Sequence, residues 1–233
     1  MGVYVNGSFV MGDFQAASSD IDFLVITRDE LRRPDLQRVG AMHRRLTSAN
    51  VWGARLEGEY VWHRRVRSAG ANGPAIVVRS GHASFAKFRT PLTAENVRAF
   101  RHDSLTLIGP PARRLLPHVP LEAVRRALNT YLAELLQRKV RRELVKLPPR
   151  AAVEAIASWT LNVAGCLYGR RSGHPCTKTV AARWLSRRCP MLKDILAAAL
   201  AMRRGTATAA DRRQLRDAVR EVRCSARHLV SSR

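Results

Sequence analysis

The chain has 233 residues, of which 46% are hydrophobic, so it is long enough to bury one large core or two smaller ones. No segment approaches the roughly 20 consecutive apolar residues that cross a bilayer, and no basic stretch followed by an apolar one opens the chain. We therefore expect a cytoplasmic protein without a membrane partner. The net charge is +23, and residues 121–233 hold 24 Lys and Arg against 8 Asp and Glu, which favours a triphosphate, a nucleic acid or an acidic partner.

The first half of the chain alternates strand and helix patterns. Apolar runs and period-two alternation predict strands, and mixed charge with apolar residues at helical spacing predicts helices. The predicted strands are 3–6, 20–27, 55–63, 75–78 and 105–108, and the predicted helices are 32–49 and 94–102.

The second half is helical in pattern throughout. Helices are predicted over 121–145, 150–168, 177–187, 190–203 and 208–229. Proline and glycine separate them, because proline cannot continue a helix and glycine commonly ends one. The change of pattern lies within the Pro117 to Pro120 segment, so we predict two domains, 1–118 and 119–233.

Two aspartates at the start of the second predicted strand are the main functional signal. Residues two apart on a strand point to the same side, so Asp20 and Asp22 are expected to project together while Ile21 faces the core. Two such carboxylates repel each other unless a cation lies between them. Oxygen ligands favour Mg²⁺ or Mn²⁺, and two ions about 4 Å apart can hold a triphosphate and activate an attacking oxygen.

Gly7 and Ser8 follow the first predicted strand and are expected to open a helix. The free N–H groups at the start of a helix are a natural seat for phosphate. Glycine allows close approach there, and Ser8 adds a hydroxyl donor. A strand, a Gly-Ser turn and an Asp-x-Asp strand together predict a phosphate-handling site.

These residues, in GSFVMGDFQAASSDIDFLV, resemble the signature of the DNA polymerase β nucleotidyltransferase superfamily. Within it, the chain is most similar to the aminoglycoside nucleotidyltransferases of the streptomycin 3″-adenylyltransferase type. The segment LNVAGCLYGRRSGHPCTKTVAARWL resembles the helix, Gly-containing turn and second helix of their C-terminal domain. The resemblance implies an α+β fold, with a nucleotidyltransferase domain containing a small mixed sheet and helices, followed by an all-α helical-bundle domain.

The resemblance also implies the chemistry. AMP would pass from ATP to a hydroxyl of a small acceptor such as an aminoglycoside, as in antibiotic resistance. Two Mg²⁺ ions would be held by Asp20 and Asp22. A third carboxylate would act as general base, and Glu57 is the nearest match. Glu59 lies on the same face of the predicted strand, so spacing alone does not separate the two. Lys178 would contact the triphosphate as a point charge.

Two other functions remain open at this point. One is nucleotidyl transfer to RNA or to a protein, as in an antitoxin, which the strongly basic second half favours. The other is a non-catalytic nucleotide-binding relic. The same positive charge is unfavourable for a polycationic drug, because like charges a few ångströms apart cost about 1 kcal/mol even in water.

Overall fold

A computed structural model of the chain describes residues 1–66, 73–89 and 92–231. It divides into two compact units, Met1–Val124 and Arg125–Arg233. None of the helices in these described ranges is both long enough and apolar enough to cross a membrane.

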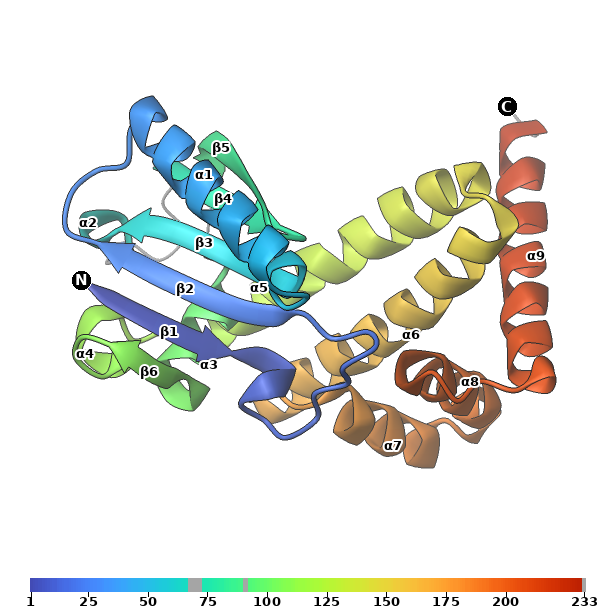
Figure 1. Cartoon of the computed structure of the whole chain (residues 1–233). Helices are drawn as coiled ribbons and strands as arrows, with labels where there is room; N and C mark the ends of the chain where they lie inside the picture. Colours follow the sequence, from blue (N-terminus) through green and yellow to red (C-terminus); the bar gives the residue numbers. More distant parts are fainter. Residues whose placement is uncertain (67–72, 90–91, 232–233) are drawn as a thin grey trace. The chain divides into compact units, whose positions relative to one another are not determined.

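The N-terminal unit is built on a six-stranded mixed sheet, with strand order β5-β4-β3-β2-β1-β6 (Figure 1). The strands are β1 (Gly2–Asn6), β2 (Ile21–Thr27), β3 (Leu56–Trp62), β4 (Gly73–Arg79), β5 (His82–Arg89) and β6 (Leu105–Ile108). The β2–β3 pair is parallel and the other pairs are antiparallel. Helix α1 (Arg33–Ala49) makes the crossover that a parallel pair requires. The predicted mixed sheet is confirmed.

Strand β5 was not predicted from the sequence. It forms a hairpin with β4, in which Arg79 pairs with His82 across the two-residue turn Ser80-Gly81. Both turn residues have positive φ, 48° and 73°, as a type I′ hairpin turn requires. Asn-Gly or Asp-Gly is the usual signal for such a turn, and a Ser-Gly pair is a weaker one, so the sequence pattern did not mark the hairpin.

The helix expected after Gly7-Ser8 does not form, and this prediction is wrong. Residues Gly7–Phe9 make a single 3-10 turn, and the next helix of any length is α1, which follows β2. The loop that follows is hydrogen-bonded back to this turn, because the Met11 N–H donates to the Gly7 carbonyl at 3.0 Å. The connection then returns the chain antiparallel to β1 as a loop that leads directly into β2.

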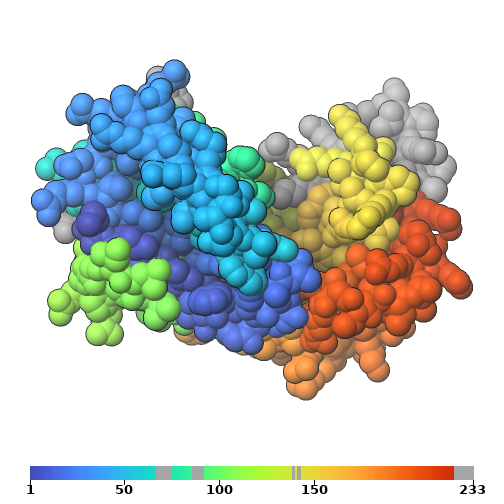
Figure 2. All heavy atoms as spheres, in the orientation of Figure 1, coloured from blue at the N-terminus to red at the C-terminus, as the bar shows by residue number. Residues whose placement is uncertain are grey.

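The sheet buries side chains on both faces. Phe23 and Tyr60 lie on the face covered by α1, where their rings contact His43. Leu24 and Ile26, which alternate with Phe23 along β2, are fully buried on the other face. In Figure 1 helix α1 lies over the sheet, and in Figure 2 its blue atoms form part of the surface of this unit. The prediction that β2 is buried on both sides, from its continuous apolar run, therefore holds.

His43 makes the stability of this unit depend on pH. Its side chain is 2% exposed, stacks on Phe23 and shares a 2.9 Å hydrogen bond with the Tyr60 hydroxyl. Burial lowers the pKa of His43, so the folded state binds its proton less readily than the unfolded state does. Stability contributed by the neutral ring is present above the ordinary histidine pKa of about 6.5 and is lost as pH falls below it.

We expect the free energy of unfolding to fall between about pH 7 and pH 5, and His43→Gln to flatten that fall. Glutamine keeps a hydrogen-bonding group near Tyr60 but does not titrate. Urea unfolding across this pH range measures the slope. His118→Gln, at an exposed histidine, is the matched control for losing an imidazole. An unchanged slope in His43→Gln would contradict the prediction.

The C-terminal unit is all-helical, as predicted. The first unit also contains the one-turn helix α2 (His63–Val66), α3 (Ala94–Asp103) and the one-turn helix α4 (Ala112–Leu115). The chain then forms α5 (Leu121–Glu134), α6 (Pro149–Ser172), α7 (Lys178–Arg188), α8 (Lys193–Arg204) and α9 (Ala209–Ser231). The helix predicted over 121–145 is not one α-helix, because α5 gives way to a π-helical segment at Leu135–Glu143.

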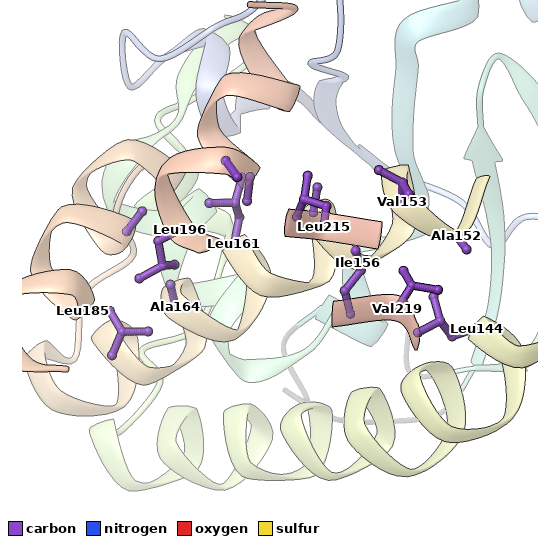
Figure 3. Packing of buried hydrophobic residues seen from close by; sticks show 14 of the residues in the cluster. Leu144, Ala152, Val153, Ile156, Leu161, Ala164, Leu185, Leu196, Leu215 and Val219 are labelled. Atoms are coloured by element: carbon purple, nitrogen blue, oxygen red, sulfur yellow. The ribbon is translucent and has the colours of Figure 1, made fainter. Parts of the chain in front are cut away.

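Local signals explain where the helices of this unit begin and end. The Thr177 hydroxyl caps α7 by accepting from the Val180 N–H at 3.2 Å. Gly173 ends α6 with φ of 75°, a left-handed conformation that glycine adopts without strain. The apolar faces of α6, α7, α8 and α9 then meet in one cluster around Leu161, Leu196 and Leu215 (Figure 3).

Candidate active site

Three polar residues form a row across the sheet where β1 ends and β2 and β3 begin. Asn6 pairs with Asp22, and Asp22 pairs with Glu57 on the parallel neighbour. Directly paired residues on adjacent strands project to the same face, so the three side chains lie side by side. The sheet register therefore brings together two of the sequence-predicted acidic residues, which are 35 residues apart in the chain.

Asp20 lies close enough to act on this row electrostatically. It directly precedes β2 and is exposed. Burial raises the pKa of Glu57, and the Asp20 charge raises it further, because a second negative charge disfavours ionisation. A cation beside Asp20 and Glu57 would relieve this repulsion.

Arg79, at the end of β4, partly offsets this repulsion. Its Nη1 lies 3.3 Å from Oε2 of Glu57, and its positive charge lowers the Glu57 pKa against the two larger effects. About half of the Arg79 side chain is exposed, so water screens the pair. Arg79 orients the Glu57 carboxylate more than it neutralises the site.

Gly7 lies directly against the Asp22 carboxylate. A Cβ atom built on Gly7 would be 2.0 Å from Oδ2 of Asp22, and the residue has φ of 73°. Only glycine combines that conformation with so close an approach. The Gly-Ser turn and the Asp-x-Asp strand are therefore in contact, as the phosphate-site interpretation requires.

We expect Gly7→Ala to lower the rate of the transfer reaction proposed below about a hundredfold, because the new methyl group displaces the Asp22 carboxylate by roughly an ångström. The left-handed backbone adds about 1–2 kcal/mol of destabilisation. Gly12→Ala is a matched control in the same loop. It has φ of 71° but no atom within 4 Å of the added Cβ, so it carries the backbone strain alone. Equal activity loss in both variants would contradict the contact argument.

Ser8 and the loop after it are held by backbone hydrogen bonds. The Ser8 carbonyl accepts from the Asp13 N–H at 3.0 Å, and the buried Ser19 hydroxyl accepts from the Gln15 N–H at 2.9 Å. The Arg55 guanidinium donates to the Ala17 carbonyl at 3.0 Å and ties the loop to the segment before β3. The loop is therefore fixed at both ends beside the row.

The two remaining predicted residues lie elsewhere. Glu59 pairs with Leu24, one pair further along β2 on the same face as Asp22, and so lies deeper in the sheet than Glu57. Lys178 belongs to the C-terminal unit, where it is the first residue of α7. The register favours Glu57 over Glu59 as the carboxylate next to the Asp-x-Asp pair.

The donor set suits a hard divalent cation only in part. Among the residues that the structure describes, no three His, Cys, Asp or Glu side chains are grouped to hold a metal ion by themselves. Asp20 and Asp22 offer oxygen ligands, and Mg²⁺ is usually held by one or two carboxylates together with phosphate oxygens and water. The residues present fit Mg²⁺ that arrives with a triphosphate.

Sequence reasoning missed two members of this site. Asn6 is only 5% exposed and is the Cα partner of Asp22, and Arg79 contacts Glu57. A polar residue that ends an apolar strand directly before Gly7 was a usable signal for Asn6. No signal marked Arg79, because its place depends on the β4–β5 hairpin that the sequence did not reveal.

Comparisons with known proteins show the fold. No known protein family and no curated protein matches the chain by sequence. Among solved structures, the chain is similar to the spectinomycin adenyltransferase AAD(9) from Enterococcus faecialis, crystallised with ATP and spectinomycin. The TM-score is 0.69 at 15% identity, over 97% of this chain and 91% of that one. The chain therefore shares the fold of that protein, a mixed sheet with helices followed by an all-helical region.

Proposed function

We propose that this protein is a metal-dependent nucleotidyltransferase that moves AMP from ATP to a hydroxyl group of a small acceptor. The observation that carries the proposal is the pairing of Asp22 with Glu57 on parallel strands while Gly7 lies against the Asp22 carboxylate. The candidate phosphate turn, a candidate metal-binding carboxylate and a candidate base thus lie together where β1 ends and β2 and β3 begin. The similarity of fold to an adenyltransferase supports the proposed nucleotidyl-transfer function.

Glu57 is the proposed general base. Its carboxylate accepts the proton of the acceptor hydroxyl while that oxygen attacks the α-phosphorus of ATP. The new bond joins the acceptor oxygen to the α-phosphorus, and the bond to the bridging oxygen of the β-phosphate breaks, so pyrophosphate leaves. Burial and the Asp20 charge raise the Glu57 pKa towards neutrality, where a base is most effective.

Gly7, Ser8 and Lys178 are proposed to hold the triphosphate. Gly7 allows the phosphates to approach the backbone, and the Ser8 hydroxyl donates to a phosphate oxygen. For Lys178, the first residue of α7, the proposal rests on the resemblance in sequence, which implies that it would supply a positive point charge to the triphosphate. Two Mg²⁺ ions held by Asp20 and Asp22 would supply charge neutralisation and polarisation of the α-phosphate when bound.

The proposed acceptor is an aminoglycoside or a related antibiotic, such as the spectinomycin bound by AAD(9). Pyrophosphate release from ATP and Mg²⁺, measured against a panel including spectinomycin and streptomycin, tests this. Release that depends on one acceptor, with the nucleotide recovered on that acceptor, supports the proposal. No release with any acceptor would contradict it.

A second measurement separates catalysis from binding alone. A ligand that binds only the folded state raises the free energy of unfolding, by about 2.7 kcal/mol at a concentration of a hundred times its Kd. The melting temperature rises with it. If ATP and Mg²⁺ stabilise the protein but no acceptor supports turnover, the chain is a nucleotide-binding relic. Transfer of label from α-labelled ATP to RNA or to protein would instead identify a macromolecular acceptor.

A further inference from the structure

A groove on the surface of the C-terminal unit is lined by none of the residues assigned above to the proposed transfer reaction. It has a volume of about 490 Å³, within the range of roughly 300–1,000 Å³ that is typical of ligand pockets. Its lining consists of two aromatic rings, one aliphatic side chain and three arginines: Tyr168, Val180, Arg183, Trp184, Arg187 and Arg188. In Figure 2 the orange atoms of α7, which carries most of these residues, lie at the surface.

Most of the lining comes from one face of α7. Val180, then Arg183 and Trp184, then Arg187 and Arg188 follow the spacing of three and four residues that places side chains on one helical stripe. The opposite face is buried in the helical cluster through Ala181, Ala182 and Leu185. The stripe is therefore presented outward as a continuous aromatic and cationic surface.

The aromatic floor is preorganised. The Tyr168 ring meets the Trp184 ring edge to face, with centroids 5.6 Å apart and an angle of 83°. The Arg188 guanidinium lies 4.9 Å from the centroid of the Trp184 ring. A planar guanidinium stacked on tryptophan leaves its outer surface available to a further planar group.

The charge of this surface is of one sign. Residues 155–193 contain seven Lys and Arg and no Asp or Glu. Within the described part of the chain, Arg183, Arg187 and Arg188 are exposed and form no ion pair with a carboxylate. A repeating anion with flat apolar groups complements such a surface in both charge and shape.

We propose that this groove binds single-stranded RNA. Bases would stack on Trp184 and on the Arg188 plane, and phosphates would pair with Arg183 and Arg187. An acidic peptide would use the arginines but leave the aromatic floor without a partner. RNA is favoured over DNA because RNA loops present unstacked bases, whereas cellular DNA is mostly duplex.

Fluorescence anisotropy of the full-length protein with a labelled oligoadenylate of roughly 12 nucleotides tests the proposal. Arg183→Gln combined with Arg187→Gln is expected to weaken binding at least tenfold. Between about 50 and 200 mM salt, the slope of log K against log salt should fall by roughly 1.4, because each phosphate contact contributes about 0.7. Arg213→Gln with Arg216→Gln, at exposed positions of α9, is the charge-matched control and should change binding less than twofold.

Stacking is tested separately, because Trp184 is partly packed against the core and its loss can affect folding. Unaltered protein should bind an abasic phosphodiester strand of the same length at least fivefold more weakly, since stacking contributes about 1–3 kcal/mol per base. Trp184→Leu, if its melting temperature is retained, should show the same loss. Any of four results would overturn the proposal. The abasic strand could bind as tightly as the intact RNA, or polyglutamate could compete as well as RNA does. DNA could bind more tightly than RNA, or the α9 double variant could weaken binding as much as the α7 double variant.

Discussion

Asp22→Asn is expected to lower the rate of AMP transfer by about a thousandfold or more, because metal-assisted charge stabilisation contributes several kcal/mol to such reactions. Asp22 is central to the site: it pairs with both Asn6 and Glu57 and touches Gly7. Asparagine keeps the shape of the side chain but loses its charge. Single-turnover kinetics with ATP and a saturating acceptor measure the loss.

The same substitution should leave folding intact. Removing one of three neighbouring carboxylates relieves like-charge repulsion, so the melting temperature without metal should be equal or higher. Asp29→Asn, at an exposed aspartate just past the other end of β2, is the matched control and should keep its activity. An Asp22→Asn enzyme with a near-normal rate would exclude the proposed metal-binding role.

Glu57→Gln is expected to lower kcat by about a hundredfold to ten-thousandfold with little change in the KM for ATP, which is the usual contribution of a general base. The acidic limb of the pH–rate profile should disappear with it. Because burial and Asp20 raise the Glu57 pKa, that limb in the unaltered enzyme should lie above the ordinary range for a glutamate. A full profile of kcat/KM against pH measures both effects.

Glu59→Gln provides the comparison that the sequence left open. Glu59 pairs with Leu24 and Val77 inside the sheet, so its substitution should act on stability rather than on the acidic limb. Circular dichroism and thermal melting separate the two effects. If Glu59→Gln removes the acidic limb while Glu57→Gln retains it, the assignment of the base is reversed.

The two strands of the candidate site could be predicted because each depends on short-range patterns. The continuous apolar run after Asp22 marks a buried strand, and the alternation around Glu57 marks a half-buried one. Gly7 and Ser8 mark a turn by composition alone. The turn was predicted correctly but the helix after it was not, since antiparallel pairing of β1 with β2 depends on contacts that local propensity does not encode.

What the sequence determined by itself was the set of chemical groups: a Gly-Ser turn, an Asp-x-Asp strand and two candidate glutamates, followed by helices with clear caps and breaks. Each of these signals spans only a few residues, so each can be recognised from the local sequence. Only the tertiary structure decided which glutamate stands beside Asp22, because Glu57 and Glu59 share a face of β3 and a register shift of two residues would exchange them. It also decided the environment of Asn6, Arg79 and the α7 groove, since burial, charge and stacking there arise from residues that are distant in the chain or on separate turns of helix.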